Sequence, residues 1–290
     1  MRKKNRILCG LLAFVLAAVM LFCPAAAISY EPDFTLTSKA VYLENLDTGL
    51  VLYEKNADQQ MYPASLTKIM TAILVLENVK DLDQETAAYP MWIQDMLYGT
   101  NASLGGLIVG EKLTIRQLLT SALVQSGNES AMILAGYVGS GGMADFMPRD
   151  ITSFVEMMND KAKALGCMGT HFTNPTGLHS DNHYSTARDM AIMAKYAMQN
   201  PVFASLVKNY AVQLGQTNKH SDLWQYSTNK MLLTSSPYYY APVVGIKTGS
   251  TDEAGRCVIS QAEDNGYRYF CVVMGAPSTA AEPFPNFIET

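Results

Sequence analysis

Cysteine is scarce in this sequence, with five among 290 residues. Cys9 and Cys23 lie in an N-terminal segment that we expect to be removed, which leaves Cys167, Cys257 and Cys271. Three cysteines cannot all pair with one another, so we expect a fold that does not depend on disulfide bridges. A single bridge between Cys257 and Cys271 stays open as the less favoured alternative.

Positive charge is also in short supply. The sequence holds 21 basic and 26 acidic residues, and the first 27 residues contain four of the basic ones and none of the acidic ones. Without that segment the net charge is −9, which argues against nucleic acid as a partner. The remaining 263 residues contain no apolar stretch long enough to cross a membrane, no internal repeat and no low-complexity linker. Such a chain can bury one large core, or two subdomains that share an interface.

The first 27 residues have the pattern of a secretory signal peptide. Four basic residues lie among the first six, residues 7–22 are apolar, and Ala-Ala-Ala at 25–27 offers a cleavage site. The apolar run is short for a bilayer span, which disfavours the alternative of an uncleaved membrane anchor. Bulky Phe22 before Cys23 disfavours a lipoprotein signal. We therefore expect an exported protein, at the outer face of the cytoplasmic membrane or in the periplasm.

The spacing of apolar residues predicts an α+β fold. Residues 40–44 and 50–53, joined by a turn at 47–49, have the pattern of a β-hairpin. Helical spacing follows over residues 65–77, 114–124, 128–138, 153–165 and 186–199. Strands are predicted at 210–214, 243–248, 255–261 and 267–274. We therefore expect one antiparallel sheet built from both ends of the chain and flanked by helices, with a helical subdomain over about 65–208.

Ser65 and Lys68 are the first candidate pair for chemistry. Ser65 opens a predicted helix, so Lys68 falls on the same face one turn along and can act as the base for a serine nucleophile. The lysine must then be neutral, which requires burial and a second cation nearby, for which Lys247 is the candidate. The alternative is a helix cap followed by an exposed lysine. We adopt that alternative for the other S-x-x-K strings, at 205–208 and 227–230.

Ser126-Gly127-Asn128 falls between two predicted helices. Ser126 would pass a proton to the leaving amine, and Asn128 would bond a substrate amide. The alternative is a simple helix cap. The S-x-N pattern recurs at 180–182, in a polar loop, and at 227–229, and we interpret the copy at 180–182 as a loop feature.

Lys247-Thr248-Gly249 occurs once in the sequence and ends a predicted buried strand. A strand edge can pair with an extended peptide, and Gly249 would let that peptide approach closely. Lys247 and the Thr248 hydroxyl would then donate to a terminal carboxylate. The backbone N–H groups of Ser65 and Ser250 would form an oxyanion hole.

Three other features have a structural explanation that we favour. His179 and His183 have the spacing of zinc ligands but lie in a loop, so we expect structural hydrogen bonding, no metal and no cofactor. The tyrosines at 238–240 could wall a substrate groove, although surface packing is favoured. Glu156 is the nearest candidate for a glutamate that would activate a deacylating water, but its surroundings predict an ordinary amphipathic helix.

Taken together, the motifs resemble those of the serine D-alanyl-D-alanine carboxypeptidases, which are low-molecular-mass penicillin-binding proteins. The resemblance extends from about residue 32 to 276 and is carried by strings at 63–71, 126–128, 174–178, 183–187 and 245–255. It implies a penicillin-binding transpeptidase/β-lactamase-like fold in which residues 28–290 form the catalytic domain, with the site between a helical subdomain and the sheet. The alternatives are a β-lactamase and a non-catalytic cell-wall binding module.

The resemblance also implies a reaction and its partners. The reaction is loss of the terminal D-alanine from peptidoglycan stem peptides through an acyl-enzyme on Ser65, and β-lactams are the implied inhibitors. Family members usually continue into a covering helix, a small all-β domain and a membrane-binding tail. This chain stops at Thr290, so we expect a missing C-terminal part that would carry any peripheral membrane attachment. A lengthened loop at 139–150 is the second departure, and we expect it to reshape the wall of the cleft.

Overall fold

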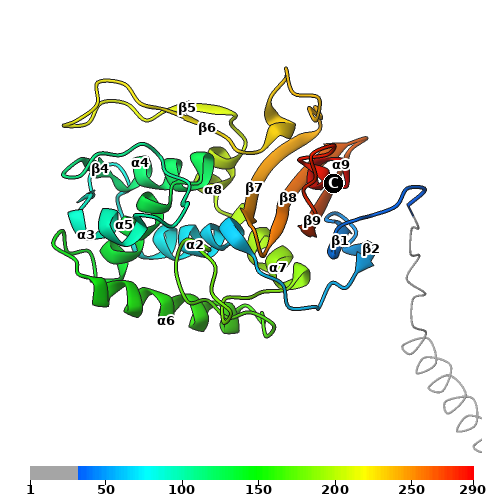
Figure 1. The fold of residues 1–290 in the computed structure, drawn as a ribbon, viewed down its shortest axis with the longest axis horizontal. Helices are drawn as coiled ribbons and strands as arrows, with labels where there is room; N and C mark the ends of the chain where they lie inside the picture. Colours follow the sequence, from blue (N-terminus) through cyan, green and yellow to red (C-terminus); the bar gives the residue numbers. More distant parts are fainter. Residues whose placement is uncertain (1–31) are drawn as a thin grey trace, which may run out of the picture.

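A computed structural model describes residues 32–290 of the chain (Figure 1). The expected signal peptide at 1–27 lies outside the described residues. Figure 1 shows a helical lobe on one side and a sheet on the other, with the strand β7 and the helix α2 at their junction. Within residues 32–290, no helix is long and apolar enough to cross a membrane.

The sheet has five antiparallel strands in the order β2-β1-β9-β8-β7. Their bounds are Ala40–Asn45 (β1), Leu50–Lys55 (β2), Val243–Thr251 (β7), Gly255–Asp264 (β8) and Tyr267–Ala276 (β9). The pairing of β1 with β9 places Tyr42 opposite Val272 and so joins the two ends of the chain, as the sequence predicts. Asn265 and Gly266 both have positive φ, which suits the tight turn between β8 and β9.

The helical lobe is built around one buried helix, α5. The helices of this lobe are α2 (Lys68–Asn78), α3 (Met91–Leu97), α4 (Ile115–Thr120), α5 (Asn128–Gly139) and α6 (Pro148–Ala164). Every residue from Asn128 to Val138 is buried, which explains why α5 is apolar on all sides after its polar first turn. The short strands Thr86–Ala88 (β3) and Lys112–Thr114 (β4), which pair in this lobe, were not predicted.

The two faces of the sheet are covered differently. Tyr42, Ile246 and Phe270 belong to the main core, which continues into the helical lobe and includes residues of α7 (Ala187–Met198) and α8 (Pro201–Val207). A second, smaller core contains Val41 and Val273 from the other side of the strands. These assignments follow from the alternation of side chains along a strand.

The C-terminal segment covers that second core. Tyr238 packs against Phe284 and Phe287, the latter on α9 (Pro285–Ile288), so surface packing is confirmed for this tyrosine. The carboxylate of Glu289 accepts hydrogen bonds from the backbone N–H and the hydroxyl of both Thr37 and Ser38. The last residues of the chain are therefore fastened to its first described segment.

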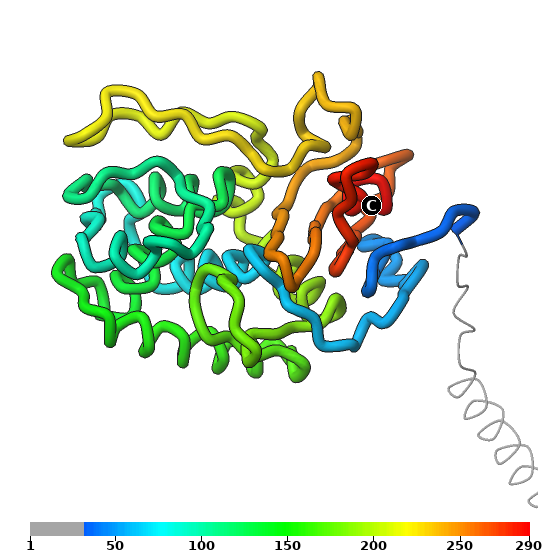
Figure 2. Tube along the Cα trace, in the orientation of Figure 1, coloured from blue at the N-terminus to red at the C-terminus, as the bar shows by residue number. Residues whose placement is uncertain are grey.

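One predicted strand does not belong to the single antiparallel sheet that the sequence predicts. Residues 211–213 (β5, Ala211–Gln213) lie outside the main sheet and pair with Trp224–Tyr226 (β6) as a two-stranded arm. Figure 2 shows this arm, in yellow, running from the sheet side across the helical lobe. Cys167, Cys257 and Cys271 are free and buried, so the bridge between the last two is not formed.

Candidate active site

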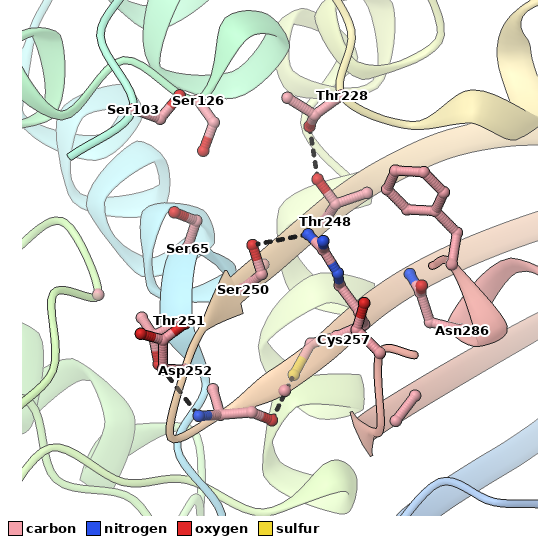
Figure 3. A pocket seen from close by; sticks show the side chains of 18 of the residues that line it. Ser65, Ser103, Ser126, Thr228, Thr248, Ser250, Thr251, Asp252, Cys257 and Asn286 are labelled. Carbon is pink, nitrogen blue, oxygen red and sulfur yellow. Dashed lines mark hydrogen bonds between the residues drawn. The ribbon is translucent and has the colours of Figure 1, made fainter. Parts of the chain in front are cut away.

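A cavity of about 1180 Å³ lies where the helical lobe meets β7. Figure 3 shows the side chains of Ser65, Ser126, Thr248 and Ser250 around this one space. The sequence-predicted residues that line it are Ser65, Ser126, Asn128, Thr248, Gly249 and Ser250. Lys68 and Lys247 are instead buried, with 0% and 1% of their surface exposed. The structure thus brings all eight predicted residues to one place, with the two lysines behind the wall.

Ser65 and Lys68 are joined by the local helical geometry. Ser65 lies in the 3-10 turn Ala64–Thr67, which runs directly into α2 at Lys68. The Nζ atom of Lys68 is 2.9 Å from Oγ of Ser65, 2.5 Å from Oδ1 of Asn128 and 2.7 Å from the backbone oxygen of Thr176. The last two can only accept hydrogen bonds. A neutral amine that donates its two hydrogens to them has its lone pair left for the hydroxyl of Ser65.

The surroundings of Lys68 favour this neutral form. Burial lowers the pKa of Lys68 well below its usual 10.5, and the charge of Lys247 lowers it further, whereas Glu129 acts in the opposite direction. Burial also lowers the pKa of Lys247, to about 7. Lys247, the second cation expected from the sequence, therefore helps to lower the pKa of Lys68, but burial lowers it more.

Ser126 is presented by a break between two helices. After the π-helical turn Ser121–Gln125, Ser126 adopts a left-handed conformation with φ of 65° and ψ of 29°. The next helix begins at Asn128, whose backbone N–H donates to the backbone oxygen of Ser103 at 2.8 Å. Because Oδ1 of Asn128 accepts from Lys68, its amide nitrogen is the group left to meet a ligand in the cavity.

The strand β7 passes very close to the turn that carries Ser65. A Cβ atom added to Gly249 would lie 2.9 Å from the backbone oxygen of Pro63 and 3.0 Å from the nitrogen of Ser65. Glycine is therefore required here by the protein's own backbone, and the close approach of a substrate peptide to Gly249 stays a prediction. The hydroxyl of Thr248 lies 2.5 Å from that of Thr228, which holds it at the cavity wall. Lys247 donates to the backbone oxygen of Thr248 at 2.9 Å.

Arg256 was missed by the sequence reasoning. It lies on β8 directly opposite Ser250, and both residues line the cavity. Its Nη1 atom is 3.3 Å from Oγ of Ser250, and its guanidinium lies over the ring of Phe284, 5.0 Å from the ring centre. No carboxylate among residues 32–290 forms an ion pair with it. Strand pairing across the turn after Ser250 is the signal that would have located this free cation.

Glu129 was also missed, although it directly follows a predicted motif. One carboxylate oxygen accepts from the backbone N–H of Gly105 at 2.6 Å and, more weakly, from that of Leu107 at 3.4 Å. The other oxygen is buried and has no hydrogen-bond partner within the described part of the chain. Burial raises the pKa of Glu129. The residue thus holds the segment at 105–107, which directly follows the cavity-wall residues 100–103.

The family of this chain follows from comparison with known proteins. The D-alanyl-D-alanine carboxypeptidase family, Peptidase S11, matches residues 26–278. The chain belongs to this family. It is 34% identical over 276 residues to the D-alanyl-D-alanine carboxypeptidase DacF of Bacillus subtilis, covering 92% of this chain and 66% of that protein. It is 33% identical over 275 residues to the D-alanyl-D-alanine carboxypeptidase of Streptomyces strain K15, covering 93% of this chain and 90% of that protein.

Two solved structures have the same fold. The crystal structure of the Streptomyces K15 DD-transpeptidase is 32% identical and has a TM-score of 0.79, covering 89% of this chain and 98% of that one. Penicillin-binding protein D2 of Listeria monocytogenes in its ampicillin-bound form is 30% identical and has a TM-score of 0.70, covering 89% of this chain and 97% of that one. The predicted fold class, a penicillin-binding transpeptidase/β-lactamase-like α+β fold, is therefore confirmed.

His183 has a structural role beside the turn that carries Ser65. It is buried, its Nδ1 accepts from the backbone N–H of Thr173 at 3.0 Å, and its Nε2 lies 2.8 Å from Oγ1 of Thr67. Burial is the main reason that its pKa is lowered to about 4. Neutral His183 therefore donates to Thr67, which in turn donates to the backbone oxygen of Ala64. Among residues 32–290, no three His, Cys, Asp or Glu side chains are placed to hold a metal ion.

The other S-x-x-K strings do not form a matching pair. The hydroxyl of Ser205 donates to the backbone oxygen of Val202. Ser227 and Lys230 do line the cavity, but the Ser227 hydroxyl accepts from the backbone N–H of Asn229, and Nζ of Lys230 lies 4.6 Å from the centre of the Phe284 ring.

The structure bears on the predictions made for Glu156 and for the loop at 139–150. Glu156 is exposed on α6, within an ordinary helix as the sequence indicates, and is not among the residues that line the cavity. The expected effect of the loop at 139–150 on the cleft is wrong. The helix α6 begins at Pro148, which shortens the loop, and none of these residues reaches the cavity.

Proposed function

We propose that this protein is an exported serine peptidase that removes the terminal D-alanine from peptidoglycan stem peptides ending in D-Ala-D-Ala. The observation that carries the proposal is the contact between Ser65 and fully buried Lys68 at the wall of the cavity. The names of the relatives support the substrate class, and the signal pattern at 1–27 supports export. Residues 28–290 would form the catalytic domain, with the helical subdomain at about 65–208.

The acylation step uses Ser65 as the nucleophile. Its Oγ bonds to the carbonyl carbon of the penultimate D-alanine while its proton passes to Nζ of Lys68. The backbone N–H groups of Ser65 and Ser250 hold the negative oxygen. The bond to the terminal D-alanine then breaks, as the departing nitrogen gains a proton through Ser126. The amide nitrogen of Asn128 bonds a substrate carbonyl.

Deacylation completes the reaction with water. A water molecule attacks the ester carbon, its proton returns through Lys68 to Oγ of Ser65, and the shortened peptide leaves with a new carboxylate. The same geometry allows an amine to replace water, which is transpeptidation. Measuring D-alanine release with and without an added amino-acid acceptor separates the two outcomes.

The terminal carboxylate of the substrate fits the end of the cavity that holds Arg256. Its guanidinium, with the hydroxyls of Ser250 and Thr248, supplies donors at the wall, and a charged donor gives a shorter and stronger hydrogen bond than a neutral one. Lys247 lies behind this wall. We therefore propose a carboxylate site in which Arg256 takes the larger part and Lys247 acts mainly through its charge.

A β-lactamase would need a group that activates water against a penicillin-derived ester. Glu156 lies outside the cavity, and Asp252 and Glu253 are the two carboxylates among its lining residues. A β-lactam leaves its amine tethered in the site after ring opening, which blocks water. We therefore expect a penicillin adduct on Ser65 that persists, inhibition of D-alanine release and little net hydrolysis of penicillin.

Labelling with a fluorescent penicillin, followed by mapping of the labelled peptide, tests the proposal. We expect the label on Ser65 and expect Ser65→Ala to lose both the label and D-alanine release with the fold intact. Ser205→Ala and Ser227→Ala are matched controls that should keep the label. Label on either control serine would overturn the assignment of Ser65, and rapid turnover of penicillin that is lost in Glu156→Gln would favour the β-lactamase.

A further inference from the structure

Three aromatic side chains form a row along the arm of β5 and β6, two of them on β6 and one just before β5. Trp224 and Tyr226 are 47% and 50% exposed, and their rings are stacked, with centres 6.5 Å apart and planes 25° from parallel. The ring of Tyr210 lies 6.1 Å from that of Tyr226. We call Tyr210, Tyr226 and Trp224 the aromatic strip. Large exposed rings gathered in this way are a common mark of a binding surface.

The arm holds the strip in a fixed position. Trp224 and Tyr226 share one face because side chains alternate along a strand, and Gln225 between them is buried on the other face. Gln225 donates from its side-chain amide to the backbone oxygen of Gly105 at 2.9 Å. The backbone N–H of Tyr226 donates to Oε1 of Gln125 at 2.9 Å. The rings therefore form a platform anchored to the helical lobe.

The strip is continuous with the candidate active site. Tyr210 lines the cavity, and its backbone oxygen accepts from the N–H of Ser227 at 2.6 Å. The next residue, Thr228, is the one whose hydroxyl contacts Thr248 on the catalytic strand. A ligand that extends out of the cavity past Tyr210 would therefore meet Tyr226 and then Trp224.

The edge of the strip is polar. The carboxylate of Asp222 accepts from the side-chain amide of Gln213 at 2.6 Å and from the indole N–H of Trp224 at 3.3 Å. Ring faces beside an amide and a carboxylate suit a sugar, because the C–H groups of a pyranose contact the electron-rich ring faces while its hydroxyls meet the polar edge. An aliphatic peptide segment would use the rings but not this edge.

We propose that the aromatic strip binds the glycan chain of peptidoglycan, a polymer of β-linked N-acetyl amino sugars, while the attached stem peptide occupies the cavity. This inference rests on the proposed function, since it takes the stem peptide as the ligand of the cavity. The strip would raise the affinity for polymeric substrate without touching the reacting atoms.

The two tryptophans of the chain make the binding directly measurable. Trp92 packs partly buried against Phe146, far along the chain from the arm, so Trp92→Phe leaves Trp224 as the one tryptophan reporter. The probe is a set of glycan strands from which the stem peptides have been removed. We expect titration to change the Trp224 emission, and we expect binding followed by calorimetry to weaken roughly tenfold in Trp224→Ala and in Tyr226→Ala.

The matched control is Tyr239→Ala, which removes a ring that is 44% exposed on the segment before β7 and does not line the cavity. It should bind the glycan as the wild type does. Release of D-alanine from a short soluble peptide should be unchanged in all three variants and slower from glycan-linked substrate in the two strip variants. The inference is overturned if the wild type does not bind the glycan strands. It is also overturned if Trp224→Ala and Tyr226→Ala bind the strands as tightly as the wild type does. Either result would be expected if the strip instead binds another protein. Failure of the short peptide to react would instead count against the proposed function.

Discussion

Replacing Lys247 by methionine should make the protein more stable near neutral pH and less active. The side chain is 1% exposed, and burial lowers its pKa from 10.5 to about 7. Each pKa unit corresponds to about 1.4 kcal/mol, so at pH 7 holding this lysine in the fold costs about 4 kcal/mol. Methionine has a similar length and no charge. It gives up the hydrogen bond to the backbone oxygen of Thr248, a loss of about 1 kcal/mol.

The expected gain is therefore roughly 3 kcal/mol at pH 7, or an increase in Tm of roughly 6–12 °C for a domain of this size. The sign follows from proton binding. Between the folded and unfolded pKa values of Lys247, the unfolded chain binds more protons, so the stability of the wild type rises with pH. The advantage of Lys247→Met should shrink as the pH rises from 7 towards 10.5.

Urea unfolding of both proteins across this pH range measures the effect, with Lys163→Met, at an exposed position of α6, as the control. The control should show no comparable gain. The same Lys247→Met substitution removes a charge that lowers the pKa of Lys68, so penicillin acylation should require a higher pH. A variant that is less stable at pH 7, or whose difference from the wild type does not change with pH, would refute the reasoning.

Three further substitutions test other parts of the site and fold. Arg256→Gln should raise KM roughly tenfold to a hundredfold for peptides with a free terminal carboxylate but not for the corresponding peptide amides. Arg256→Lys should restore part of this loss. Equal increases in KM for both substrates would exclude the carboxylate role. Glu129→Gln keeps a hydrogen-bond acceptor for Gly105 but removes a charge that raises the pKa of Lys68. The pH below which the acylation rate falls should therefore be lower in this variant than in the wild type. An unchanged pH profile would contradict this prediction. Glu289→Ala should destabilise the protein by about 2 kcal/mol at pH 7. Burial acts to raise the pKa of Glu289, but its hydrogen bonds from Ser38 and Thr37 outweigh burial and lower the pKa below 4.5, so this difference should shrink as acid protonates the carboxylate. Equal unfolding of both proteins at pH 7 would refute its anchoring role.

The parts of the fold that were predicted correctly are those with strong local patterns. The hairpin at 40–53, the helices around Ser65 and Asn128, and the turn at 264–266 combine regular apolar spacing with turn residues. The arm was only half predicted. Trp224–Tyr226 is three residues long and exposes two aromatic rings, so it shows no alternation long enough to mark a strand.

Site residues were found where a motif places them and missed where only folding brings them together. Ser65, Ser126 and Thr248 come from motifs that are far apart in the chain, and the family pattern implied their meeting. Arg256 and Glu129 belong to no such motif. Arg256 lines the cavity because β8 pairs it with Ser250, whereas Glu129 does not line the cavity and is held by a buried hydrogen bond from Gly105. The exact strand register and the burial of Glu129 come from the folded structure.

The two buried lysines connect the stability of this fold with its proposed chemistry. A lysine that is to accept a proton from Ser65 at neutral pH must lose most of its preference for the charged form, and burial is the main means that the structure provides. Burial of Lys68 within α2 places it in the core of the helical lobe, and Lys247 lies behind the cavity wall on β7. Both would be replaced by apolar residues if the fold were selected for stability alone. The burial of these two lysines at the wall of the cavity that Ser65 lines is thus a physical argument, independent of the relatives, for the acyl transfer that we propose.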